Sequence, residues 1–105
     1  MPDFPDYDRD EAVLTESETR LDKPKLFKVI LHNDDFTTME FVVFILRTVF
    51  RRSEIEAFTI MMQVHEEGIG VAGIYPFEIA QMKAEKAINI SRAHEYPLLC
   101  TVEEE

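Results

Sequence analysis

The hydrophobic pattern of this chain changes its period abruptly after residue 32. Residues 26–32, Leu-Phe-Lys-Val-Ile-Leu-His, are rich in apolar and β-branched side chains, which is typical of a buried β-strand. Asn33, Asp34 and Asp35 follow, and from Met39 onward the apolar residues recur at helical spacing. The chain is therefore expected to pass from a strand to a helix through a turn that carries three oxygen-rich side chains.

The first helix is predicted to begin at Thr37, because Thr37 and Glu40 have the spacing of a capping box, and to end near Arg51 or Arg52. Its apolar residues at helical spacing are Met39, Val42, Ile45, Leu46, Val49 and Phe50, with Phe41 and Phe44 in a second stripe. Two apolar stripes on one helix predict that the helix is covered on more than one side.

The second helix is marked at both ends. Ser53 and Glu56 form another capping box, and Gly68 is placed to stop the helix after about Glu67. The side expected to face the core carries Ala57, Ile60, Met61, Val64 and His65.

Two more strands and one helix complete the pattern. Residues 70–75 and 96–102 are predicted to be strands, and Pro76 suits the first turn of a third helix. The stripe of that helix is Phe77, Ala80, Ala84, Ala87 and Ile88. The order strand, helix, helix, strand, helix, strand predicts an α/β fold of the α+β type, a two-layer sandwich with the helices packed on one face of a three-stranded sheet.

Residues 1–24 differ in composition from the rest of the chain. They carry eight acids and three bases, and their apolar residues are sparse and aperiodic. Such a segment cannot bury enough surface to offset the entropy lost on ordering. We therefore predict a disordered acidic extension over residues 1–24, either a solvated leader or a handle for a partner, and one core domain over residues 25–105.

Charge and cysteine content limit the function classes. The chain carries 21 acids and 11 bases, a net charge of −10 at pH 7. It would repel phosphate backbones and anionic lipids, so no nucleic acid or membrane partner is expected, and a cationic ligand or a basic surface is favoured. A single cysteine, Cys100, fits a reducing compartment, and no signal peptide or long apolar run is seen, so we expect a cytoplasmic protein.

The turn after residue 32 admits a metal, an ammonium group or no ligand at all. Asn33, Asp34 and Asp35 have oxygen atoms that suit Mg²⁺ or Ca²⁺, but the alternating acids of a calcium loop are missing. The aspartates would equally serve the turn and the N-terminus of the following helix, where the dipole favours carboxylates. The residues alone leave these alternatives open, and a metal-dependent enzyme using Asp34 and Asp35 is the less favoured one.

Histidine and cysteine give no stronger sign of catalysis. Zinc at His65 would need more ligands than His32, His94 and Cys100 can bring together. A thiol in an apolar strand is more often inert than nucleophilic. We therefore expect neither an enzyme nor a bound metal or cofactor.

Three separated blocks of the sequence resemble the ClpS adaptor family: KVILHNDDFTTMEFV, IMMQVHEEGIGVAGIY and YPLLCT. The resemblance spans nearly everything from Lys25 to Thr101 and implies a monomeric domain of three antiparallel strands and three helices. It implies an adaptor that recognises proteins by a destabilising N-terminal Leu, Phe, Tyr or Trp and hands them to a ClpA-type AAA+ unfoldase coupled to the ClpP protease. A small interaction domain without this specificity is the alternative.

The same resemblance implies roles for individual residues. Asn33, Asp34 and His65 would surround the α-amino group of the bound protein. The apolar pocket for its first side chain would be formed by Leu31, Thr37, Met39, Val42, Met61, Val64 and Leu98, with Met39 as a gate against β-branched residues. Glu78 and Lys83 would face the N-terminal domain of the unfoldase, which would also engage the N-terminal extension during delivery.

Overall fold

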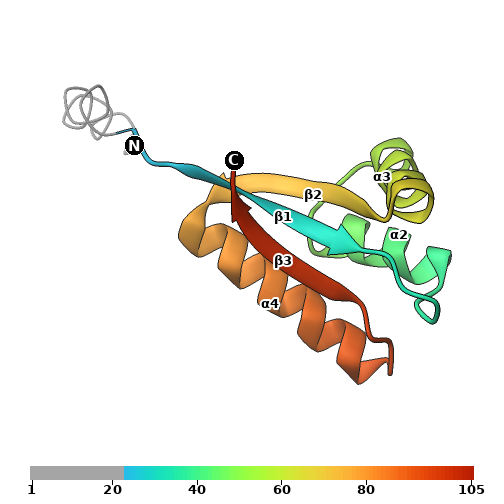
Figure 1. Ribbon diagram of the computed structural model, residues 1–105. Coiled ribbons are helices and arrows are strands. Elements are labelled where there is room, and N and C mark those ends of the chain that lie inside the picture. The colour runs from blue at the N-terminus through green and yellow to red at the C-terminus, as the bar shows by residue number, and fades with distance from the viewer. Residues whose placement is uncertain (1–22) are drawn as a thin grey trace, which may run out of the picture.

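The computed structural model describes residues 23–105, so the predicted acidic extension lies outside the described residues except for its last two (Figure 1). The elements are β1 (Leu26–His32), α2 (Met39–Thr48), α3 (Glu54–Glu67), β2 (Ile69–Pro76), α4 (Phe77–Ala93) and β3 (Leu99–Glu104). The predicted order β-α-α-β-α-β is confirmed. Within residues 23–105, no helix has both the length and the hydrophobicity that a membrane span requires.

The three strands form one antiparallel sheet in the order β2-β1-β3, as the two-layer interpretation requires. The helix α4 packs along one face of this sheet, while α2 and α3 lie at the end where β1 stops and β2 starts (Figure 1). Phe27, Val29 and Leu31 of β1 point toward the helices, since Val29 and Leu31 are fully buried in the helix-side core and Phe27 packs against it. The loop that leaves β1 is therefore held between the sheet and the two shorter helices.

Small residues allow α4 to approach the sheet closely. Ala80 and Ala87 are fully buried, and so is Ser91, whose hydroxyl donates to the carbonyl of Ala87 at 2.7 Å. The prediction that Phe77 lies in the buried stripe is wrong, because its side chain is 49% exposed, although its ring forms a T-shaped pair with that of Phe27 at 5.1 Å between centroids. The buried stripe starts at Ala80, one turn later.

The first helix differs from its prediction at both ends. Its N-cap is Thr38, whose hydroxyl accepts from the N–H of Phe41 at 3.1 Å, and not Thr37, whose side chain bonds to a residue of the preceding turn. It ends at Thr48 rather than at Arg51 or Arg52. The cause is local, because Arg51 adopts a left-handed conformation with a φ of 55°, which reverses the chain toward α3.

The last strand begins later than predicted, at Leu99 rather than at Tyr96. The guanidinium of Arg92 donates to the carbonyls of Tyr96 and Leu98 at 3.0 and 2.8 Å. These bonds hold both carbonyls in the loop after α4, so β3 starts only at Leu99. The strand continues further at its other end, where Glu104 pairs with Phe27.

The predictions for α3 and β2 hold. Ser53 and Glu56 form the reciprocal capping box, and Gly68 ends the helix in a left-handed conformation with a φ of 93°. One residue of α3 departs from its expected place: His65 is exposed rather than turned into the core.

Removing the cap hydroxyl of α2 should weaken the fold measurably. Thr38→Ala leaves the N–H of Phe41 without its acceptor, and we expect a loss of about 1 kcal/mol in the free energy of unfolding. Urea unfolding followed by circular dichroism would measure it. Thr38→Ser keeps the hydroxyl and should stay close to the parent protein; an equal loss in both variants would contradict the assignment of Thr38 as the cap.

Candidate functional site

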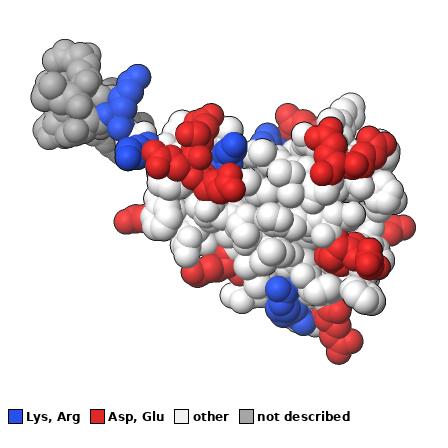
Figure 2. All heavy atoms as spheres, viewed as in Figure 1, with Lys and Arg blue, Asp and Glu red and all other residues white. Residues whose placement is uncertain are grey.

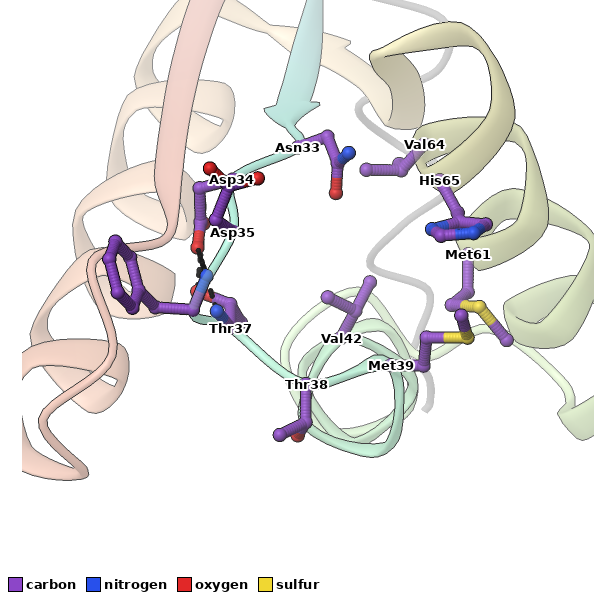
Figure 3. A pocket seen from close by; sticks show the side chains of 11 residues that line it. Asn33, Asp34, Asp35, Thr37, Thr38, Met39, Val42, Met61, Val64 and His65 are labelled. Carbon is purple, nitrogen blue, oxygen red and sulfur yellow. Dashed lines mark hydrogen bonds between the residues drawn. The ribbon is translucent and has the colours of Figure 1, made fainter.

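A pocket of about 400 Å³ opens where β1 ends, and its volume lies in the range of small-ligand sites, about 300–1,000 Å³. The turn after β1 forms one side, α3 forms the opposite side, and the start of α2 lies below (Figure 3). The lining residues are Asn33, Asp34, Asp35, Phe36, Thr37, Thr38, Met39, Val42, Met61, Val64 and His65.

The pocket has an apolar part and a polar part. Val42, Met61 and Val64 are 6%, 5% and 2% exposed and form apolar wall, while Met39 is 42% exposed and stands at the open side. Asn33 and His65 project from opposite sides of the cavity, one from the turn and one from α3 (Figure 3). The arrangement suits a ligand that has a polar group beside an apolar one.

Asp34 organises the turn that precedes α2. Its Oδ1 accepts from the N–H groups of Phe36 and Thr37 at 2.8 and 2.7 Å, and its Oδ2 accepts from the hydroxyl of Thr37 at 2.8 Å. This explains why the sequence places Thr37 before the cap: its hydroxyl closes the turn on Asp34 and leaves Thr38 to start the helix. Because this turn leads directly into α2, it also fixes the position of Met39, the first residue of the helix.

The carboxylate of Asp34 is also held in its charged form. Partial burial by itself would raise its pKa, but the N–H groups of Thr37 and Phe36, the hydroxyl of Thr37 and the positive charge of Arg92 together lower the pKa below its ordinary value. Three of the acceptor positions of Asp34 are already used within the turn. Asp34 therefore contributes mainly a fixed negative charge and the shape of the turn.

The side chains of Asn33 and His65 have no hydrogen-bond partner among the described residues. Within residues 23–105, neither side chain makes a hydrogen bond to another residue, although the main chain of Asn33 is anchored by its N–H, which donates to the carbonyl of Gly68 at 2.8 Å. This bond ties the end of β1 to the end of α3, so the two side chains are set on either side of the pocket by rigid elements. Two unpaired acceptors beside one negative charge form a suitable site for a small cation with several donors.

Loss of the Thr37 hydroxyl should raise the pKa of Asp34. In Thr37→Val the turn loses one hydrogen bond to the ionised form, so the folded-state pKa should move up toward its ordinary value. The lowered pKa stabilises the fold above the unfolded-state pKa, about 3.9, and that contribution disappears as the pH falls through the folded-state pKa. We expect the acid-unfolding midpoint of Thr37→Val to lie at higher pH, and an NMR titration of the carboxyl to show the shift.

The matched variant is Thr37→Ser, which keeps the hydroxyl but not the methyl group. Its Asp34 pKa should stay near that of the parent protein. A pKa that rises equally in Thr37→Ser and Thr37→Val would mean that the hydrogen bond is not the cause.

Two residues expected in the pocket wall lie deeper. Leu31 and Leu98 are fully buried, belong to the hydrophobic core and are not among the lining residues. The other residues that the family resemblance implied, namely Asn33, Asp34, His65 and the remaining wall residues, all line the pocket. The role of each of them toward a ligand stays a prediction.

Arg92 supports the site and was not singled out from the sequence. Besides holding the carbonyls of Tyr96 and Leu98, it places a positive charge near Asp34. The loop it holds brings the ring of Tyr96 to 4.6 Å from that of Phe41 in α2, centroid to centroid. The only sequence signal for this role is a basic residue in the last turn of a helix, which many helices have.

The two residues expected to contact an unfoldase differ in their surroundings. Glu78 is exposed near the start of α4. Lys83 is partly buried, donates to the carbonyl of Val49 at 2.9 Å and lies 5.4 Å from the centre of the Tyr75 ring. Its burial, with the positive charges of Arg51 and Lys86, lowers its pKa. Lys83 thus stabilises the end of α2, and contact with a partner stays a prediction for both residues.

The described residues offer little for metal or thiol chemistry. No three His, Cys, Asp or Glu residues between 23 and 105 lie close enough to hold a metal ion. The thiol of Cys100 is buried, and burial raises its pKa to about 12 despite the nearby charge of Arg92, so it stays protonated at neutral pH. Asp34 and Asp35 therefore have no third protein ligand within the described part.

Comparison with known proteins agrees with this geometry. The family model described as "ATP-dependent Clp protease adaptor protein ClpS" matches residues 22–101 of the chain. A protein named ATP-dependent Clp protease adapter protein ClpS from Desulfatibacillum aliphaticivorans is 50% identical over 93 residues, which cover 89% of this chain and 89% of that protein. A protein of the same name from Nitratidesulfovibrio vulgaris is 51% identical over 101 residues, or 96% of this chain and 99% of that protein.

A solved structure resembles the whole described domain. The structure of Agrobacterium tumefaciens ClpS2 bound to L-phenylalaninamide superposes with a TM-score of 0.76 at 41% sequence identity, covering 79% of this chain and all of that one. The ligand of that protein combines a free α-amino group with an apolar side chain.

Proposed function

The chain belongs to the ClpS family of ATP-dependent Clp protease adaptors, and from this membership we propose that it binds proteins by a destabilising N-terminal residue and delivers them to a Clp unfoldase for degradation. The observation that carries the proposal is the pocket at the end of β1. There the side chains of Asn33 and His65, which bond to no other described residue, and the negative charge of Asp34 stand beside an apolar cavity. An N-terminal Leu, Phe, Tyr or Trp has this combination of groups in a single residue.

The polar part of the pocket suits the α-amino group. A free N-terminus has a reference pKa of about 8, so it is a cation with several N–H donors at neutral pH. The amide oxygen of Asn33 and one unprotonated nitrogen of His65 are placed to accept from it, while Asp34 supplies charge directly or through water. Hydrogen bonds to a charged group contribute about 1.5–3 kcal/mol each.

The apolar part suits the first side chain. Val42, Met61 and Val64 are almost fully buried, so their rotamers are fixed by the core behind them. Transfer of a Leu or Phe side chain from water into such a wall contributes about 1.5–3 kcal/mol. Leu31 and Leu98, behind the wall in the core, would limit the depth that a longer side chain can reach.

Delivery requires a second contact. We propose that a ClpA-type unfoldase binds through its N-terminal domain near Glu78 and Lys83 of α4, and that it engages residues 1–24 as a handle. On this proposal the adaptor works as a cytoplasmic monomer, without cofactor and without an enzymatic reaction of its own. Glu78 is exposed and accessible to such a partner, whereas Lys83 is partly buried.

A reconstituted degradation assay tests the proposal. With a ClpA-type unfoldase and ClpP, the protein should accelerate degradation of a reporter that begins with Phe but not of one that begins with Met. Excess L-phenylalaninamide should abolish the acceleration, and a chain that starts at residue 25 should still bind a Phe-starting peptide while failing to deliver. Equal degradation of both reporters would instead favour a small interaction domain without N-terminal specificity.

A further inference from the structure

The sheet has a second face, turned away from the helices, and the strand register defines its residues. Since Phe27, Val29 and Leu31 point toward the helices, the alternate residues of β1 point the other way. With their cross-strand neighbours they form three rows: Ile74, Lys28 and Glu103; Val71, Ile30 and Thr101; Ile69, His32 and Leu99. We call these nine residues the outer sheet face.

The outer sheet face is apolar at its centre and along its β2 edge. Ile30 is only 4% exposed, yet it is not part of the helix-side core, so its neighbours on the same face must cover it. Ile69, Ile74 and Leu99, around it, are 48%, 43% and 46% exposed. Large aliphatic side chains that share one flat surface and stay half exposed are typical of an interaction site rather than of an ordinary solvated surface.

Most of the charged groups lie around this apolar surface, and on the face itself charge is confined to the row that contains Lys28 and Glu103. Figure 2 shows an uncharged expanse over the strands, with acidic groups gathered around its margin. Glu66 and Glu67 lie two and three residues before Ile69 in the chain, and on the other side Glu103 and Glu104 end β3 and Glu105 follows. Lys28 and Lys25 are the nearby cations, and Lys25 already pairs with Glu104 at 3.5 Å.

We propose that the outer sheet face is a docking surface for a basic, amphipathic segment of a protein partner. The apolar side chains of that segment would cover Ile69, Ile74 and Leu99, and its Lys or Arg residues would meet the acidic margin. A second copy of this chain is disfavoured because it would bring two acidic margins together, and the net charge of −10 disfavours lipid and nucleic acid. The inference does not depend on the proposed N-terminal pocket.

An amphipathic Leu/Lys peptide of about 18 residues, or about five helical turns, is the probe for this surface. Acetylation of the peptide keeps it out of the N-terminal pocket. Titrated into the ¹⁵N-labelled full chain, it should shift the amide resonances of Ile69, Val71, Ile74 and Leu99 more than those of α3 or α4. Its Leu/Glu counterpart should bind at least about tenfold more weakly, because its charges repel the margin.

Paired variants test the apolar contact without changing charge. Ile69→Gln with Ile74→Gln should weaken binding of the Leu/Lys peptide about tenfold, because two aliphatic contacts are lost. Ile55→Gln with Phe58→Gln, on the exposed side of α3, should leave it within about twofold, since those side chains are 79% and 56% exposed but lie outside the face. A far-UV circular dichroism spectrum and a urea-unfolding midpoint close to those of the parent protein would show that each variant is folded.

Several outcomes would overturn the inference. Resonance shifts centred on α3 or α4, equal binding of the Leu/Glu peptide, or equal losses in both double variants would show that the attraction is not specific to the face. Concentration-dependent association blocked by the Ile69→Gln, Ile74→Gln pair would assign the face to a second copy. Binding that appears only after removal of residues 1–22 would assign it to the chain's own N-terminal segment.

Discussion

A peptide that begins with a free Phe should bind this protein at least about 100-fold more tightly than the same peptide with an acetylated N-terminus. Acetylation removes the positive charge and leaves a single N–H, so the acceptors of Asn33 and His65 lose their partner. Two hydrogen bonds to a charged donor, at about 1.5 kcal/mol each or more, account for a factor of that size. Fluorescence anisotropy with the two labelled peptides would measure the difference.

The matched variants for this experiment are Asn33→Ala and Asn89→Ala. Asn33→Ala should weaken binding of the free peptide about tenfold or more, because one acceptor is lost. Asn89 is an exposed residue of α4, away from the pocket, and its replacement should change nothing. Equal binding of the free and acetylated peptides would contradict N-terminal recognition, and equal losses in both variants would point away from Asn33.

The same contact predicts a pH dependence of binding. Above about pH 8 the α-amino group of the peptide loses its charge, and the affinity should fall. Anisotropy titrations of the free Phe-starting peptide at neutral pH and about two pH units higher would measure this loss. The acetylated peptide has no amine to titrate and should show no such change.

The ends of a helix could be predicted from the sequence where a single local interaction determines them. Ser53 and Glu56 cap α3 by reciprocal bonds within four residues, and Gly68 ends it by a backbone preference of its own. Thr37 and Thr38 show the limit of this reasoning. Either hydroxyl would suit an N-cap, and the choice is made by Asp34, which takes the hydroxyl of Thr37 for the turn.

The pocket could not be derived from periodicity, because its parts come from three separate segments. A helical projection of α3 puts His65 beside Met61 and therefore predicts it to be buried, but the cavity leaves it exposed. Only the resemblance to a family implied that Asn33 and His65 act together. The start of β3 likewise depends on Arg92, which bonds to the carbonyls of the loop before the strand. The periodicity of the sequence does not reveal these bonds.

Met39→Ala should admit peptides that begin with Ile or Val, which the parent protein should bind weakly. Met39 is the first residue of α2, is 42% exposed and lines the pocket together with the buried side chains of Val42 and Met61. A β-branched residue carries its second branch next to its own main chain, so that branch would meet Met39 as the ligand enters. Overlap of this kind costs about 1–3 kcal/mol, and its removal should raise the affinity for an Ile-starting peptide about tenfold or more.

The control for this prediction is Met82→Ala, a change of the same size at a methionine of α4 that is 58% exposed and outside the pocket. It should leave the affinities for Phe-, Leu- and Ile-starting peptides unchanged. In Met39→Ala the affinity for Phe should fall only a few-fold, because most of the apolar wall remains, so the ratio of Ile to Phe binding is the decisive quantity. If this ratio stays as low in Met39→Ala as in Met82→Ala, selection against β-branched residues must come from the fixed wall of Val42, Met61 and Val64 rather than from Met39.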